Sequence, residues 1–340
     1  MNSPHLHVTR VMPVSGAGRA ILAFTLLAIS NLSAFGQARV SASMRLDFLP
    51  GGYHAPFFLA LERGYYRDNG IDLQINDGKG SVPTIQVVGS NLDTFGLAGL
   101  SAVALAISKG IPLICVGGLI QKDPNSILSL AGSNIAKPKD VEGKRGAFVA
   151  TSASDRLFQS LAKVNDIDLS KVTVLNVSNE ARYAAVLHGN ADFTVGWSFS
   201  DGYRLNKQKP IAPPVLFSDY GVTMLGIGLF VTKETAAKRP QLVKGFLAAT
   251  ARGAQEAMDD PQAAVAAVLK LRPDVDPQFL LDGANKLSAH IRTKNSANLP
   301  LLAMAKPDWD ETRHNLINYL EMPRTLESEA FYTNDFVASR

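Results

Sequence analysis

Cysteine is almost absent from this sequence, because Cys115 is the only one and lies within an apolar run. A single thiol cannot form a disulfide within the chain. None of the four histidines after residue 38 stands at metal-ligand spacing from another histidine or from the cysteine; they are His54, His188, His290 and His314. No GxSxG, P-loop or GxGxxG pattern occurs. These absences predict a protein without a metal site, without a cofactor and without catalytic activity.

Acidic residues are missing from the first 46 positions, where Arg10 and Arg19 precede the apolar run Ala20 to Ile29. A basic start, a short apolar segment and small residues before a cleavage point are typical of a secretory signal. The run is too short for a membrane anchor, which needs about 20 apolar residues. The sequence therefore predicts a signal peptide over residues 1–38 that is cleaved on export to the periplasm, with the cut near residue 37 or 39.

A strong excess of charge is also lacking. Without residues 1–38 the chain loses two of its 34 Lys and Arg and none of its 30 Asp and Glu, so the mature protein is close to neutral. A neutral surface gives no electrostatic reason to expect nucleic-acid binding. No later apolar stretch is long enough to cross a bilayer, and about 300 mature residues are more often two domains than one.

Strand-like runs alternate with helical patterns along the mature chain, which is typical of parallel sheets with crossover helices. Strands are expected over 44–49, 71–75, 94–98, 112–116, 145–149, 172–176, 193–195, 215–217 and 227–231. Helices are expected over 56–69, 82–91, 101–109, 154–165, 181–188, 240–258, 261–269, 277–287 and 309–320. Two α/β halves of similar size with a helical tail predict an α/β protein of two lobes.

Glycine, serine and threonine gather in the loops that leave predicted strands, at 51–54, 78–81, 99–101 and 151–154. In open α/β sheets, ligands bind at the carboxyl ends of strands, where free backbone N–H groups can donate to them. The alternative is structural, with glycines making turns and hydroxyls capping helices. Four such loops in two halves favour a ligand-binding cleft.

Aromatic residues accompany two of these positions. Tyr53 and His54 follow the first glycine pair, and Trp197 follows a strand between Gly196 and Ser198. Tyr53 and Trp197 are predicted as opposing stacking surfaces for a ligand, and His54 as the source of a ring nitrogen. Core packing for Trp197 and a structural hydrogen-bonding role for His54 remain the alternatives.

Several segments together resemble one family: HAPFFLALERGYYRDNGIDLQI at 54–75, GSNLDTFGLAGLSAVALAISKGIPLICVGGL at 89–119, KPKDVEGKRGAF at 137–148 and YAAVLHGNADFTVGW at 183–197. They are similar to the solute-binding subunits of bacterial ABC importers, in the group of the NMT1/THI5-like thiamine-precursor, sulfonate and nitrate binding proteins. The resemblance implies a type II periplasmic-binding-protein fold, in which two lobes of mostly parallel sheet flanked by helices enclose a ligand. The first lobe is expected over 39–125, the second over 126–222, and 223–340 returns to the first.

The resemblance also implies a set of ligand-binding residues in the interlobe cleft. These are Tyr53, His54, Gly80, Ser81, Gly99, Ser101, Thr151, Ser152, Ser154 and Trp197. The implied partners are a small-molecule ligand and the transmembrane permease of an importer, with the protein itself expected as a monomer.

The two aromatic candidates favour a planar aromatic or heterocyclic ligand, such as a pyrimidine precursor of thiamine. A sulfonate or nitrate remains the alternative, since Lys79, Arg156 and the loop serines can donate hydrogen bonds to an anion. A sensor adaptor is a second alternative to import. The eukaryotic enzymes of pyrimidine synthesis in this family have a cysteine-rich motif, which a chain with Cys115 alone lacks. The expectation is therefore a binding protein rather than an enzyme.

Overall fold

The computed structural model describes Met1, Thr9, residues 39–149 and residues 153–338. The predicted signal peptide lies almost wholly outside the described residues. The chain from Arg39 onward forms one compact unit, and its strands divide between two five-stranded sheets.

The first sheet has the strand order β2-β1-β3-β10-β4. Its strands are β1 (Val40–Arg45), β2 (Ile71–Asn76), β3 (Phe95–Gly99), β4 (Leu113–Ile120) and β10 (Ile227–Thr232). β1 pairs in parallel with β2 and β3, whereas β10 is antiparallel to both β3 and β4. Four strands therefore run in one direction and only β10 runs against them. This sheet and the helices that pack on it are called the first lobe below.

The second sheet repeats this plan with the order β7-β6-β8-β5-β9. Its strands are β5 (Asn125–Ser129), β6 (Arg145–Phe148), β7 (Thr173–Asn176), β8 (Phe193–Trp197) and β9 (Val215–Leu216). β6 pairs in parallel with β7 and β8, and β5 is antiparallel to β8 and β9. This sheet and its helices are called the second lobe.

The reversed strand in each sheet is the one that arrives from the other sheet. β5 follows β4 through residues 121–124, and β10 follows β9 through residues 217–226. We call these two segments the first and second crossover. Two mixed sheets joined in this way, each flanked by helices, confirm the two-lobed α/β fold expected from the sequence. The expected lobe boundaries at residues 125 and 222 stay a prediction.

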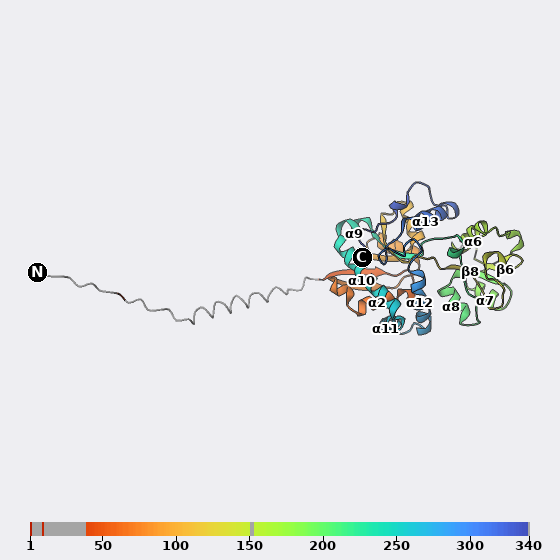
Figure 1. The fold of residues 1–340 in the computed structure, drawn as a ribbon, viewed down its shortest axis with the longest axis horizontal. Helices are drawn as coiled ribbons and strands as arrows, with labels where there is room; N and C mark the ends of the chain where they lie inside the picture. Colours follow the sequence, from red (N-terminus) through yellow and green to blue (C-terminus); the bar gives the residue numbers. More distant parts are fainter. Residues whose placement is uncertain (2–8, 10–38, 150–152, 339–340) are drawn as a thin grey trace. The chain divides into compact units, whose positions relative to one another are not determined.

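Helices fill the connections between strands and form most of the last third of the chain. The α-helices are α2 (Ala55–Glu62), α3 (Tyr65–Asp68), α4 (Ser81–Gly89), α5 (Leu100–Ser108), α6 (Ala153–Val164), α7 (Ala181–Leu187), α8 (Ser200–Asn206), α9 (Lys233–Lys238), α10 (Pro240–Asp259), α11 (Pro261–Leu271), α12 (Pro277–His290) and α13 (Lys306–Tyr319). The 3₁₀ helices are η1 (Gly52–His54), η2 (Pro138–Val141), η3 (Leu169–Lys171), η4 (Phe217–Tyr220) and η5 (Ser328–Ala330). In Figure 1, α2, α10, α11 and α12 lie together, and α6, α7 and α8 gather around β6 and β8.

The starts of the C-terminal helices follow from local chemistry. Asp260 and Asp276 each precede a proline, and their carboxylates accept from the backbone N–H of Ala263 and Gln278 at 2.9 Å. An aspartate cap satisfies an N–H that has no partner within the helix, and proline fits the first helical position. Helices α11 and α12 therefore begin where the sequence predicts.

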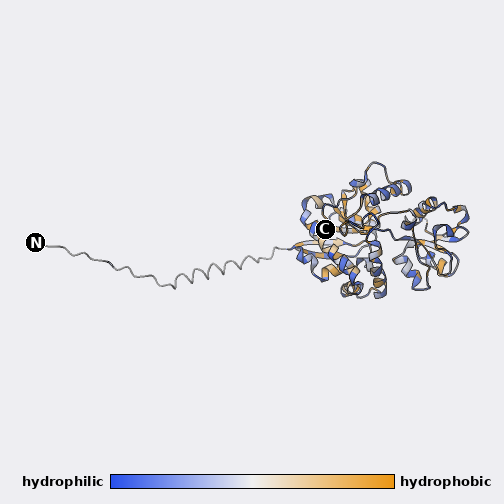
Figure 2. Cartoon of the chain, in the orientation of Figure 1, coloured by the Kyte–Doolittle hydropathy of each residue, from blue (hydrophilic) through white to orange (hydrophobic). Residues whose placement is uncertain are grey.

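Apolar side chains from both sheets and their helices form the core. Figure 2 shows hydrophobic and hydrophilic residues side by side along the helices of both lobes, as expected of helices with one face on a core. In the first lobe, Phe95 of the sheet stacks on Phe246 of α10 with ring centroids 3.8 Å apart. Trp309 of α13 is fully buried and stacks on Tyr332.

Some of the predicted elements differ from the structure, and some elements of the structure were not predicted. The first strand spans Val40–Arg45 rather than 44–49, so Asp47 lies in a loop and not in a strand. The helix expected over 56–69 is two helices that meet at Gly64, whose φ is 77°. Strand β5 was not predicted, because its sequence NSILS is short and begins with polar residues. The short helix α8 was also missed.

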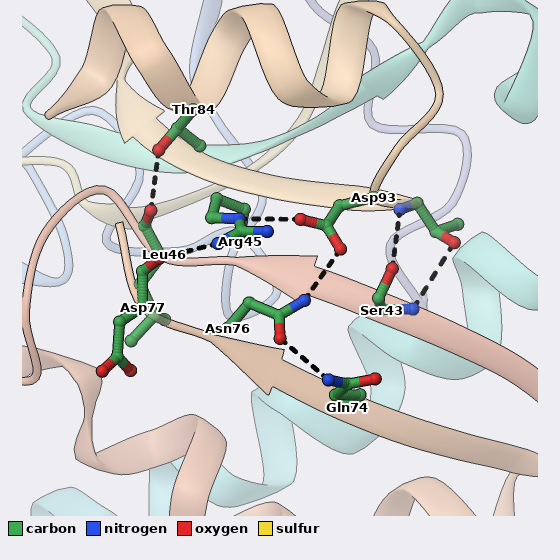
Figure 3. A network of polar contacts seen from close by, with 9 residues as sticks. Ser43, Arg45, Leu46, Gln74, Asn76, Asp77, Thr84 and Asp93 are labelled. Carbon is green, nitrogen blue, oxygen red and sulfur yellow. Dashed lines mark hydrogen bonds and ion pairs between the residues drawn. The ribbon is translucent and has the colours of Figure 1, made fainter. Parts of the chain in front are cut away.

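A polar network at the carboxyl ends of β1 and β2 fixes the loops that follow them (Figure 3). The Arg45 guanidinium lies 2.7 Å from the Asp93 carboxylate and donates to the carbonyl of Asp77 at 3.0 Å. Asn76 donates to the other oxygen of Asp93 at 2.8 Å, and the Thr84 hydroxyl donates to the carbonyl of Leu46 at 2.8 Å. The network anchors the loops beside the candidate site to the sheet.

Candidate functional site

The three loops at the carboxyl edge of the first sheet are joined by hydrogen bonds. The backbone N–H of Gly80 donates to the carbonyl of Asp47 at 2.7 Å, and the N–H of Gly99 donates to the Ser81 hydroxyl at 3.0 Å. A Cβ atom on Gly99 would lie 3.8 Å from the Ser101 hydroxyl oxygen. The structure thus brings Gly80, Ser81, Gly99 and Ser101 together, as the positions of their strands predicted.

Asp47 organises the loop that contains Tyr53 and His54. Its two carboxylate oxygens contact the Tyr53 hydroxyl at 3.0 Å and the His54 Nε2 at 2.7 Å. The backbone N–H of Gly51 donates to His54 Nδ1 at 2.8 Å, so Nε2 carries the ring proton and donates to Asp47. Burial, followed by the neighbouring Asp47, raises the pKa of Tyr53 well above its usual value.

The prediction that His54 offers a ring nitrogen to a ligand does not match this geometry. His54 is completely buried, and both of its ring nitrogens are engaged within the chain. Its role is to hold Asp47 and the loop backbone in place. Tyr53 differs from His54 in that it is only partly buried.

The glycine pair Gly51 and Gly52, before Tyr53, does not form the sharp turn that is expected of glycines after a strand. Gly51 is extended, with φ −127° and ψ 175°. Gly52 lies against α12, where a Cβ atom would come within 2.1 Å of the Leu280 carbonyl oxygen. Gly283 of α12 lies opposite it, since a Cβ there would lie 3.0 Å from the Gly52 Cα. Two glycines in contact let η1 and α12 pack backbone to backbone.

Trp197 ends β8 at the carboxyl edge of the second sheet. Its backbone N–H donates to the Asp201 carboxylate at 2.7 Å, and Asp201 also contacts Arg182 at 3.1 Å. Arg182 in turn donates to the carbonyl of Val195 at 2.6 Å, so the end of β8 is firmly held. The Trp197 side chain is half-buried and packs against the core of the first lobe.

Side chains of the two lobes meet around Phe199. Its ring centroid lies 6.1 Å from that of Tyr53 and 4.7 Å from that of His290, at the end of α12. Nearby, Lys286 of α12 donates to the carbonyl of Ser198 at 3.2 Å. Phe199 therefore joins the second lobe to Tyr53 and to α12 of the first lobe, and the sequence reasoning did not identify it.

The first crossover adds a polar group to the same edge of the second sheet. Asn125 donates from its backbone N–H and its side-chain amide to Asp123 Oδ1, at 2.6 and 2.5 Å. The Ser154 hydroxyl donates to the Asn125 side-chain oxygen at 2.5 Å. Burial raises the pKa of Asp123 to about 6, while the hydrogen bonds from Asn125 oppose that shift. Asn125 pairs with Trp197 across β5 and β8.

The other predicted residues of the second lobe are only partly placed. Ser154 is buried at the start of α6 and belongs to the polar group at Asn125. Thr151 and Ser152 lie outside the described residues, and the use of the predicted site residues other than His54 in ligand binding stays a prediction. Among the described residues, no cluster of three or more His, Cys, Asp or Glu is arranged to hold a metal ion.

Sequence reasoning missed Asp47, Asp123, Asn125 and Phe199. Asp47 was assigned to a strand, and the segment from Asp123 to Asn125 preceded a strand that was not predicted. The Asp-Pro-Asn sequence at 123–125 could have indicated a turn, because such residues are typical of turns.

No helix in the described part of the chain has the length and apolar character needed to span a membrane.

Residues 52–264 match the family model described as NMT1/THI5 like. The chain is 23% identical over 313 residues to a 4-amino-5-hydroxymethyl-2-methylpyrimidine phosphate synthase of Legionella pneumophila, covering 89% of this chain and 94% of that protein. It is 22% identical over 304 residues to a formylaminopyrimidine-binding protein of Halalkalibacterium halodurans, covering 88% and 90%. The crystal structure of the periplasmic aliphatic sulphonate binding protein SsuA from Escherichia coli superimposes with a TM-score of 0.63 at 15% identity, covering 85% of this chain and 91% of that one.

These relatives correct one expectation. The prediction of a protein without catalytic activity is contradicted by the comparisons. The Legionella relative and yeast relatives are named as phosphate synthases, which are enzymes. The absence of common catalytic motifs and of a cysteine-rich segment therefore does not separate this chain from enzymes. The relatives do support the binding of a small ligand.

Proposed function

The chain belongs to the NMT1/THI5-like family, and from this premise we propose that it captures a small planar heterocycle between its two lobes and delivers it to the permease of an ABC importer. A pyrimidine related to the precursors of thiamine is the favoured ligand. The formylaminopyrimidine-binding relative supports this choice, as do the phosphate synthases, whose named product contains the same ring.

The observation that carries the proposal is the meeting of aromatic side chains at the facing edges of both sheets. Tyr53 comes from the first lobe and Trp197 from the second, and both are only partly buried. The ring of Phe199, from the second lobe, is buried, with its centroid 6.1 Å from that of Tyr53. Flat rings stack well on such surfaces, and hydrogen-bonding groups beside them fix orientation. Asp47, Ser81 and Asn125 supply polar groups from both lobes.

Release of bound molecules tests the proposal most directly. The exported protein would be purified without added ligand, denatured, and its small molecules identified by mass spectrometry. A pyrimidine or a related heterocycle is the expected result. An aliphatic sulfonate or nitrate would contradict it. Incubating the refolded protein with the identified compound and repeating the measurement would reveal any chemical conversion.

Export and delivery need their own measurements. Intact mass of the periplasmic protein should show the loss of about 36 to 38 residues. Uptake of the labelled heterocycle should fall when the gene for this protein is deleted. Uptake that continues unchanged without the protein would favour a sensor adaptor over an import subunit.

A further inference from the structure

Asp123 is a buried carboxylate at the junction of the two lobes. It lies in the first crossover, between the end of β4 in one sheet and the start of β5 in the other. Only 6% of its surface is exposed. The carbonyl of the next residue, Pro124, accepts from the backbone N–H of Ser198 at 2.9 Å, so Asp123 lies close to the end of β8 and to Trp197.

Asp123 has no cationic partner among the described residues, whereas Asp219 and Asp282 each pair with a lysine. Its Oδ1 accepts both hydrogen bonds from Asn125, and no described residue donates to Oδ2. Oδ2 is not among the buried atoms that lack a partner, so it is not sealed from solvent. Of the nearby cations, Lys122 lies 2.7 Å from Asp219 in the second crossover and Lys286 lies 2.6 Å from Asp282 on its own helix. Both are already neutralised.

The turn at this position does not require a charge. An asparagine at 123 would accept the same two hydrogen bonds from Asn125 and would not place a carboxylate in a buried place. The raised pKa of Asp123 reflects that penalty. A charge that costs stability and that the local fold does not need is a feature typical of functional sites.

The groups around Asp123 also point to a ligand. Ser154 and Asn125 form a chain of hydrogen bonds that ends on the Asp123 carboxylate, so this edge of the second lobe presents an acceptor. The Ser198 hydroxyl is buried and has no hydrogen-bond partner among the described residues. Trp197, directly before Ser198, is only partly buried. An acceptor, an unpaired hydroxyl and a partly exposed aromatic residue therefore lie on paired segments of the chain, at the start of β5 and the end of β8.

We propose that Asp123 accepts a hydrogen bond from an N–H group of the ligand, so that the site selects a heterocycle with an amino group or a protonated ring nitrogen over an anion. This inference rests on the proposed function and specifies its ligand chemistry. An unpaired carboxylate attracts a donor and repels a sulfonate or a nitrate. Hydrogen bonds to charged groups are strong enough to give tenfold to hundredfold selectivity.

Calorimetric titration with matched probes tests the inference. The probes are 4-amino-2-methylpyrimidine, 2-methylpyrimidine, which lacks only the amino group, and methanesulfonate. The proteins are the wild type, Asp123→Asn and Asp192→Asn, the last removing a second-lobe carboxylate that is paired with Arg145 and whose loss leaves Lys122 neutralised. The wild type and Asp192→Asn should prefer the amino compound at least about tenfold, and Asp123→Asn should lose most of that preference.

The outcomes separate the inference from the proposed function. A wild type that binds neither pyrimidine overturns both. A wild type that binds the amino compound, with an Asp123→Asn variant that keeps the same preference, overturns the inference alone. Tighter wild-type binding of methanesulfonate than of the amino compound also overturns it. Thermal melts of each variant check folding, and Asp123→Ser, which can make the same turn, replaces Asp123→Asn if that variant does not fold.

Discussion

At the scale of the residue, Tyr53 and Trp197 carry the clearest prediction. Both side chains are half-buried, and Trp197 packs against the core of the first lobe. Tyr53→Ala and Trp197→Ala should each weaken ligand binding by about 1 to 3 kcal/mol through lost stacking and burial. Titration beside thermal melts of the same variants measures this. If Trp197→Ala loses about 3 to 5 kcal/mol of stability while its folded fraction binds normally, Trp197 belongs to the core.

A second residue prediction concerns stability and pH. The pKa of Asp123 is about 6 in the folded chain because burial disfavours its charge, and it is lower in the unfolded chain. Between about pH 4 and 6 the folded state therefore binds more protons, so stability should fall as pH rises through that window, by up to about 3 kcal/mol. Asp123→Asn should be more stable than the wild type at pH 7 without ligand. Urea unfolding at pH 4.5 and 7 measures this, and a variant less stable than the wild type at pH 7 would contradict it.

At the scale of the element, the contact between η1 and α12 positions the aromatic loop. A Cβ on Gly52 would lie 2.1 Å from a helix carbonyl oxygen, whereas a Cβ on Gly51 meets only side-chain atoms at 3.5 Å or more. Gly52→Ala should therefore cost about 3 kcal/mol or more of stability, because backbone must move. Gly51→Ala, the matched control, should change stability by less than about 1 kcal/mol. If the two substitutions lower the free energy of unfolding by the same amount in urea, the close packing of Gly52 against α12 does not determine the stability of this region.

At the scale of the whole molecule, residues on or beside α8 and at the start of α12 make a polar contact between the two lobes. Asp276, which caps α12, accepts from Tyr203 at 2.9 Å and from Lys207 at 2.7 Å, both on or beside α8. These hydrogen bonds, first from Lys207 and then from Tyr203, lower the pKa of Asp276 to about 2. The contact should therefore persist as the pH falls to about 3, and it should weaken with salt.

Asp276→Asn should then shift the lobes toward a more open arrangement, since it removes the charge on which both donors converge. Small-angle scattering should give a larger radius of gyration for ligand-free Asp276→Asn than for the wild type, and ligand should reduce the difference. Glu234→Gln, which breaks a surface pair with Lys238 within one helix, is the control. The same radius of gyration in Asp276→Asn and wild type would mean that this contact does not hold the lobes.

The alternation of strands and helices, with glycines and hydroxyls after the strands, was enough to predict two α/β lobes and the grouping of Gly80, Ser81, Gly99 and Ser101. These features follow from local patterns, because periodicity and turn chemistry are written in short segments. The tertiary structure alone decided the roles of His54, Gly52 and Asp123. The ring nitrogens of His54 are hydrogen-bonded to Asp47 and to the backbone of Gly51. Gly52 packs against α12, which lies more than 200 residues later in the chain, and Asp123 lies between the two sheets. Burial and the identity of a distant neighbour determine whether a polar side chain is free to bind, and neither is encoded in the residues next to it.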